Sequence, residues 1–431
     1  MYDGLFTFVV RLAKIALTAA LAILTARALG PAGRGIYALP GVEAALVGSA
    51  FGGLSSATTY FLLNRNPNKS LLRAIFLATF ALVVAAAVAV VPLAYLAGQA
   101  SAAIPAILVL PSFALLNLAS GYALGIKRVR FSSTIAALQT FFTIAVMLAA
   151  FVLAQRTPAV AIGAWVAGST IAGIVSLAYI LIHGNSRLNG PDTIGIREYW
   201  HFCLKVTSVN VVTLLNYRAD LYIVALFLPP AALGMYSIAV AGAESLLVPT
   251  QVAALVTSPH IGGMEVRDAA LLTARCVRHN LLISIVVCVP LFIFAEPVIK
   301  ALYGPKFVPL VPAFDILLIG VLVLSLSSPV SSFFTLKLGV PQVTFRLATL
   351  SALVCIATTI ALVRDLGMAG AAIGSSAGYV VGQTIGLWYF AKRARIGARL
   401  MLLPTASDAL VYWSFLTQVL RDGRRLLRPA P

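Results

Sequence analysis

Charged and polar side chains lie inside apolar stretches of membrane-spanning length, where they could bind a charged ligand or carry a proton. Arg11, Lys14 and Thr18 follow one another at spacings of three and four within residues 5–29, so they share one face of a helix. A charged side chain in the membrane interior costs about 3 kcal/mol on insertion scales, so it usually faces water or a partner. Two interpretations fit this face: residues that line a water-filled cavity, or an anchor whose long side chains reach the headgroups.

Acidic, amide and hydroxyl side chains lie in three further apolar runs. Glu43, in residues 37–63, is predicted either to pair with a basic residue of residues 5–29 or to be a proton site. Residues 200–228 and 231–259 each gather polar side chains on one helical face. Across these runs we expect the residues that line a substrate cavity to be Arg11, Lys14, Thr18, Glu43, Asn210, Tyr217, Arg218, Asp220, Glu244 and Gln251.

The composition indicates which elements position these residues. Of the 431 residues, 61% are hydrophobic and 10% are charged, and the mean hydropathy is +0.99. Such a chain has too little polar surface to cover a soluble globule, and in lipid its backbone must satisfy its own hydrogen bonds as helices. We therefore expect an all-α integral membrane protein. Twelve runs are long enough to span a bilayer: 5–29, 37–63, 71–97, 103–125, 131–154, 158–182, 200–228, 231–259, 270–295, 309–336, 343–363 and 369–391.

The net charge of +18 is explained by topology and not by a nucleic-acid partner, because the basic residues fall in short segments between the runs. With a cytoplasmic N-terminus, 24 of them lie on the inner side and six on the outer side, so both termini are predicted to be cytoplasmic. The first run is expected to remain as an anchor and not to be a cleaved signal sequence. In the basic tail, residues 405–420 predict an amphipathic helix on the inner leaflet, held by anionic membrane lipids.

A short motif occurs twice and indicates an internal duplication. Residues 31–37 read PAGRGIY and residues 230–236 read PAALGMY, 199 residues apart. The longest polar break, at residues 184–199, lies between the two copies and is typical of a linker. The predicted organisation is a first bundle (1–183), a cytoplasmic linker (184–199), a second bundle (200–392) and a basic tail (393–431).

Four stretches carry a resemblance to a known family. Residues 216–259, with RADL, PPAALGMY and AESLLVPTQ, resemble the polysaccharide flippases of the multidrug, oligosaccharidyl-lipid and polysaccharide exporter superfamily. Residues 27–37, 302–307 and 367–374 look like three further landmarks of that family. The resemblance implies two six-helix bundles, related by an axis along the membrane normal, around a central cavity formed by the first, second, seventh and eighth spans.

The resemblance also implies a function. Family members of this kind move undecaprenyl-diphosphate-linked oligosaccharides from the inner to the outer leaflet of the bacterial cytoplasmic membrane, for export of exopolysaccharide, capsule or O-antigen. In this chain Arg11, Lys14 and Arg218 are the candidates to attract the diphosphate. Glu43, Asp220 and Glu244 could neutralise them, three charges against three. A polysaccharide polymerase and export machinery are further expected partners.

Other classes of function remain open alternatives. A cation-coupled exporter of drugs or metabolites would use an acid within the membrane to carry the proton. Glu43, Asp220 and Glu244 are candidates for that acid, so this function stays an alternative. An enzyme is disfavoured because the predicted outer loops are too short to hold a catalytic site, and a scaffold would have no reason to bury charges on four helices. The four scattered cysteines predict neither disulfide nor metal, and no cofactor is expected.

Overall fold

The computed structural model describes residues 2–403, with gaps at residue 66 and at residues 97–101, 184–189, 252–256, 258–260 and 262–263. This part of the chain is almost entirely helical, and one isolated β-bridge joins Pro67 to Asp192. The longer helices are α1 (Tyr2–Gly48), α2 (Gly52–Asn64), α3 (Ser70–Leu96), α4 (Ala103–Gly125), α5 (Val129–Leu153), α6 (Pro158–His183), α7 (Ile196–Phe227), α8 (Pro230–Glu244), α10 (Val266–Ile293), α12 (Val311–Leu324) and α14 (Pro341–Ala394). The shorter ones are η1 (Ser49–Phe51), α11 (Ala295–Tyr303), η3 (Pro305–Leu310), α13 (Ser327–Ser332), the π-helix η4 (Phe333–Lys337) and α15 (Ala398–Leu402). The amphipathic helix expected at residues 405–420 lies outside the described residues.

Nine helical stretches of the described residues are long and apolar enough to cross a membrane. The two longest, Val9–Asn64 and Pro341–Ala394, are each broken at a glycine with positive φ, 67° at Gly30 and 59° at Gly367. Glycine adopts this backbone conformation without the steric cost that other residues bear. The chain is therefore an all-helical, multi-pass membrane protein, while the number of twelve crossings stays a prediction. The turn expected over residues 29–37 is a break at Gly30, because Pro31 already starts the next helical segment.

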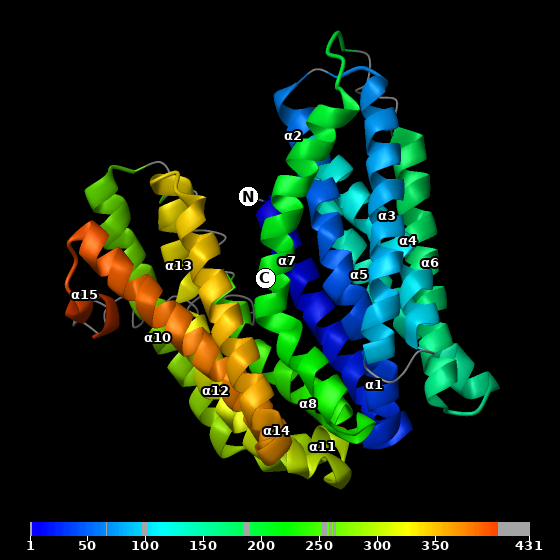
Figure 1. Ribbon diagram of the computed structural model, residues 1–431, viewed down its shortest axis with the longest axis vertical. Coiled ribbons are helices and arrows are strands. Elements are labelled where there is room, and N and C mark those ends of the chain that lie inside the picture. Colours follow the sequence, from blue (N-terminus) through cyan, green and yellow to red (C-terminus); the bar gives the residue numbers. More distant parts are fainter. Residues whose placement is uncertain are drawn as a thin grey trace, which may run out of the picture.

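The helices form two groups that meet at one end of the molecule and diverge towards the other (Figure 1). One group contains α1 to α6, and the other contains α10 and α12 to α15. Helices α8 and α11 lie at the end where the groups meet, whereas the turn after α2 lies at the opposite, divergent end. The two groups of helices therefore form a V, and the polar residues lie on its two arms or where the arms meet.

The two copies of the repeated motif pack against each other where the groups meet. A Cβ atom added to Gly35 would fall onto the carbonyl oxygen of Pro230 and lie 2.5 Å from its carbonyl carbon. A Cβ atom added to Gly234 would fall onto the carbonyl oxygen of Pro31 and lie 2.7 Å from the backbone nitrogen of Gly35. Only glycine permits this approach of the two backbones, which joins α1 to α8. These four residues are called the glycine seam below.

A second contact holds the same end together. The guanidinium of Arg27 donates to the carbonyl oxygen of Leu302 at 2.7 Å and also to that of Ala301. These two carbonyls belong to the last turn of α11, where the helix has no internal donors left for them and its dipole favours a cation. Arg27 therefore links the first group of helices to the second beside the glycine seam.

Helix α7 contacts both groups along its length. Near its start, the Tyr199 hydroxyl is 2.9 Å from that of Thr58, and Thr207 donates to the carbonyl of Ala50 at 2.9 Å. Near its end, the Tyr217 ring lies 6.2 Å from that of Tyr379 on α14. Helix α7 thus begins on the first group and ends on the second.

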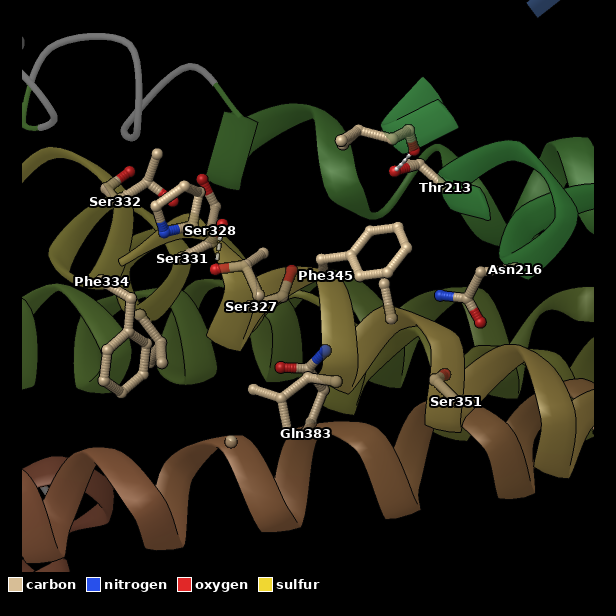
Figure 2. Close-up of a pocket in the computed structure, with 18 of the residues that line it drawn as sticks. Thr213, Asn216, Ser327, Ser328, Ser331, Ser332, Phe334, Phe345, Ser351 and Gln383 are labelled. Carbon is tan, nitrogen blue, oxygen red and sulfur yellow. Dashed lines mark hydrogen bonds between the residues drawn. The ribbon is translucent and has the colours of Figure 1, made fainter. Parts of the chain in front are cut away.

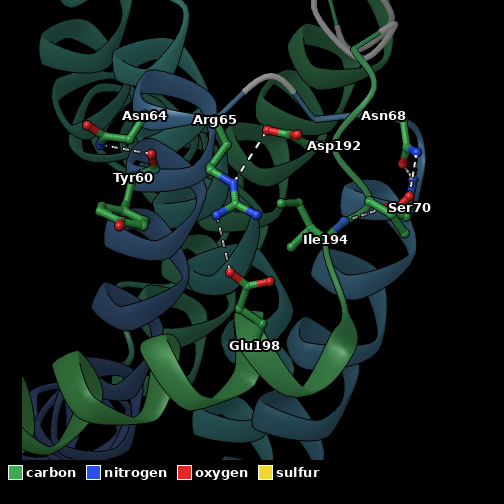
Figure 3. A network of polar contacts seen from close by, with 9 residues as sticks. Tyr60, Asn64, Arg65, Asn68, Ser70, Asp192, Ile194 and Glu198 are labelled. Atoms are coloured by element: carbon green, nitrogen blue, oxygen red, sulfur yellow. Dashed lines mark hydrogen bonds and ion pairs between the residues drawn. The ribbon is translucent and has the colours of Figure 1, made fainter.

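The described part of the predicted linker is fixed to the turn between α2 and α3 (Figure 3). Arg65 Nε lies 3.4 Å from the Asp192 carboxylate, and its Nη1 lies 4.0 Å from that of Glu198 at the start of α7. Asn68 donates to the hydroxyl of Thr193 at 3.0 Å. These contacts tie the start of α7 to the divergent end of the first group.

Candidate functional site

Arg218 and Glu244 form a two-pronged ion pair between α7 and α8. The two guanidinium nitrogens lie 2.9 and 2.8 Å from the two carboxylate oxygens, with 29% and 21% of the side chains exposed. Parallel hydrogen bonds of this kind are among the strongest that side chains make. Glu244 therefore offsets the charge that Arg218 was expected to offer to a ligand.

Asp220, whose charge made it a candidate to line a cavity, is a buried and hydrogen-bonded carboxylate. Only 2% of it is exposed, and its carboxylate accepts hydrogen bonds from Tyr236 at 2.8 Å and Ser375 at 2.6 Å. The backbone N–H of Leu221 donates to its second oxygen at 2.7 Å. The carboxylate thus joins α7, α8 and α14, which gives it a structural position.

Glu43 is fully buried, and neither carboxylate oxygen has a hydrogen-bond partner among the described residues. The expected pairing with a basic residue of the first span is therefore wrong. The reason is burial, because Glu43 lies on a fully buried part of α1, whereas Arg11 and Lys14 lie on an exposed part of that helix. Burying a charge without a partner costs several kcal/mol, so this group is an energetic burden in the described state.

Replacing Glu43 with glutamine should leave the protein at least as stable as the wild type. The amide keeps the shape of the side chain and cannot carry the unpaired charge, so we expect a gain of about 0–1 kcal/mol in the free energy of unfolding. Thermal unfolding of the purified protein measures this change, with the half-exposed Glu198→Gln as control. A loss of more than about 1 kcal/mol would mean that an ionised, partnered carboxylate is needed there.

The candidate residues of the first span are exposed. The side chains of Arg11 and Lys14 are both exposed. Neither forms an ion pair with the described residues. Thr18 donates its hydroxyl to the carbonyl of Lys14 at 2.9 Å. The start of α1 lies on the side of the first group that faces the second (Figure 1).

The remaining candidates, Tyr217, Asn210 and Gln251, lie in three different surroundings. Tyr217 lines a cavity in the second group of helices. Asn210 packs closely on Gly52, on the first group. Gln251 is exposed at the end of the described residues after α8. Of the candidates, the structure therefore brings Arg218 and Glu244 into direct contact with each other.

That cavity has a volume of about 670 Å³ and lies between α7, α13, η4 and α14 (Figure 2). More than half of the described residues that line it carry a hydroxyl or amide group, although most of the lining surface is apolar, and no Asp, Glu, Lys, Arg or His is among them. Of the ten residues expected to line a substrate cavity, Tyr217 alone lines this one. The sequence feature that could have indicated this cavity is the group of serines between Ser325 and Ser332. In the structure this segment continues into the π-helix η4, a feature common at functional sites.

Comparison with solved structures identifies the class of fold. An inward-facing multidrug resistance MATE family transporter of the MOP superfamily matches with a TM-score of 0.71 at 15% identity, over 90% of this chain and 98% of its own. The lipid II flippase MurJ in an inward closed conformation also gives 0.71 at 15% identity, over 89% and 87%. An outward-facing MATE transporter gives 0.64 at 15% identity, over 91% and 94%. The chain has the fold of MOP-superfamily transporters.

The family follows from the sequence itself. Residues 23–312, more than half of the chain, match the family model described as polysaccharide biosynthesis protein. The chain therefore belongs to this family of polysaccharide biosynthesis proteins. No curated protein matches it at a significant level.

Proposed function

We propose that the protein is a flippase that moves undecaprenyl-diphosphate-linked oligosaccharides from the inner to the outer leaflet of the bacterial cytoplasmic membrane. Family membership supports a role in polysaccharide synthesis, and the fold supports transport by alternating access. The glycan would then pass to a polysaccharide polymerase and the export machinery. In this proposal both termini and the divergent end of the molecule face the cytoplasm.

The observation that carries the proposal is the pair of exposed basic residues on α1. Arg11 and Lys14 face no acidic partner among the described residues, whereas Glu244 offsets Arg218. Two adjacent positive charges in a membrane-spanning segment suit a diphosphate, which carries several negative oxygens at one end of a long lipid. The greater likeness to inward-facing than to outward-facing transporters supports loading from the cytoplasmic side.

Replacing both Arg11 and Lys14 with alanine should lower the rate of translocation by about tenfold or more, because each charge-assisted contact is worth about 1.5–3 kcal/mol. Both side chains are exposed, so the free energy of unfolding should change by less than about 0.5 kcal/mol. The measurement is the appearance of glycan outside vesicles that contain the protein and the lipid-linked oligosaccharide.

The matched control removes two other exposed basic residues, Lys69 and Arg73, from the turn before α3 and the first turn of that helix. This double variant should translocate at the wild-type rate. Equal rates for the Arg11/Lys14 variant and the wild type would reject the basic pair as the diphosphate site. Absence of translocation by the wild type would reject the flippase itself.

A second function, cation-coupled export of a drug or metabolite, is favoured by the buried and unpartnered Glu43. A carboxyl that is neutral in one state and ionised in another can couple a proton to transport. Uptake of a fluorescent organic cation into vesicles under a proton gradient separates the two functions. Uptake that is lost in Glu43→Gln would favour the exporter, and no uptake by the wild type would exclude it.

A further inference from the structure

We propose that the uncharged cavity between α7, α13, η4 and α14 binds the sugar portion of the ligand, separately from the residues that attract its diphosphate. This inference rests on the proposed function for the identity of the ligand, but the cavity itself is defined by geometry. Its volume of about 670 Å³ falls within the range of ~300–1,000 Å³ typical of ligand pockets.

Unfilled hydrogen-bonding capacity indicates that the cavity accommodates a polar ligand. Asn216 is only 7% exposed, and its side-chain oxygen has no partner among the described residues. Ser328 and Gln383 make no side-chain hydrogen bond with the described part of the chain either (Figure 2). An unsatisfied buried amide costs about 1–3 kcal/mol. A ligand hydroxyl, which both donates and accepts, would remove that cost once the Asn216 amide turns its oxygen into the cavity, because in the structure this oxygen is closed to solvent.

The absence of charge in the described lining narrows the class of ligand. The start of α14 lines the cavity through Pro341 and Gln342, but no Lys or Arg accompanies it among the described lining residues, so a diphosphate would lack the cations that offset its charge. An organic cation would likewise lack an acid. A lipid tail would leave the hydroxyl and amide groups unpaired. A neutral sugar fits, since its hydroxyls match Asn216, Ser328 and Gln383.

The aromatic side chain of Phe345 gives the cavity an apolar surface for the flat face of a sugar ring. The ring of Phe345 lines the cavity and is 37% exposed, and Figure 2 shows it between the side chains of Asn216 and Ser327. A sugar ring has an apolar face of C–H groups, and a flat aromatic ring offers it an apolar surface of similar size. The cavity thus combines a polar and an apolar surface, as a sugar does.

The first experiment compares two ligands by native mass spectrometry of the full-length protein: the lipid-linked oligosaccharide and bare undecaprenyl diphosphate. The wild type should bind the first about tenfold more tightly than the second. The double variant Asn216→Leu/Gln383→Met keeps side-chain volume and removes two polar partners, so it should lose this advantage and bind undecaprenyl diphosphate as before. The matched control Gln155→Met, in the loop after α5, should keep the advantage. A double variant that retains it overturns the inference.

A second experiment separates this inference from the proposed function. Ser328→Cys places a thiol in the cavity that a maleimide can label. Three of the protein's own cysteines are buried and Cys276 is partly buried, so the background labelling is measured on the wild type. Free neutral di- to tetrasaccharides should slow labelling at least about threefold, and inorganic diphosphate should not. If the wild type binds neither lipid, the flippase proposal fails, and protection by the saccharides still supports a sugar site. Labelling that is unaffected by the saccharides overturns the sugar site whatever the lipids do.

Discussion

Replacing Gly35 with alanine should destabilise the protein by about 3 kcal/mol and drive its two groups of helices apart at the glycine seam. The added methyl group would fall onto the carbonyl oxygen of Pro230 and lie 2.5 Å from its carbonyl carbon, both of which are backbone atoms that no rotamer change can move. Relief therefore requires α1 and α8 to separate. Thermal unfolding of the purified protein measures the loss, and a spin-label distance across the seam measures the separation.

Gly41→Ala is the matched control for this prediction. Gly41 lies in the same helix six residues later, and a Cβ atom there meets nothing within 4 Å. Alanine favours the helix, so this variant should be unchanged or more stable by up to about 1 kcal/mol. Gly234→Ala should behave like Gly35→Ala, and combining them should cost less than the sum, because both relieve one contact. Similar unfolding temperatures for Gly35→Ala and Gly41→Ala would contradict the seam.

Removing either partner of the Arg218–Glu244 pair should lower the free energy of unfolding by about 3 kcal/mol. Both side chains are less than one-third exposed, so the group left behind is a poorly solvated charge without a partner. The reversed pair, Arg218→Glu with Glu244→Arg, should recover a large part of the loss. A double-mutant cycle that includes the Arg218→Ala/Glu244→Ala variant measures the coupling energy between the two residues.

The exposed ion pair of Arg65 and Asp192 is the control for this cycle. Its side chains are 44% and 37% exposed and its charged atoms are 3.4 Å apart, so truncating Arg65 should cost at most about 1 kcal/mol. Additive losses at Arg218 and Glu244 would contradict a coupled pair. If translocation is retained when both residues are alanine, Arg218 is a structural partner and not a ligand for the diphosphate.

The sequence contained enough information for the class of fold but not for the pairing of its charges. Long apolar runs force the backbone into helices, and the two copies of the PAxxGxY motif predicted the duplication whose copies meet at Gly35 and Gly234. Helical periodicity predicted polar faces that carry Arg218 and Glu244, and in the structure these two residues form an ion pair. It could not show that these faces meet, because the distance between two helices depends on packing that no local pattern records.

The cavity beside the serine-rich segment 325–332 could not be predicted from the sequence for a different reason. Small residues such as Ser327 and Ser328 allow both close packing and bending of membrane helices. In the structure they border a cavity beside a π-helix. Hydroxyl side chains serve packing and ligand binding equally well, so composition alone could not separate the two. The buried Glu43 posed the same difficulty, because a sequence does not show which way a side chain points.

The reciprocal contact at the glycine seam bears on the origin of the chain. Position 5 of each motif copy meets position 1 of the other, which is the isologous pattern that a two-fold axis generates between identical subunits. An ancestor half as long could have formed a homodimer through this contact. Gene fusion would have preserved that interface and freed each half to evolve separately, so that one acquired the basic pair of α1 and the other the neutral cavity.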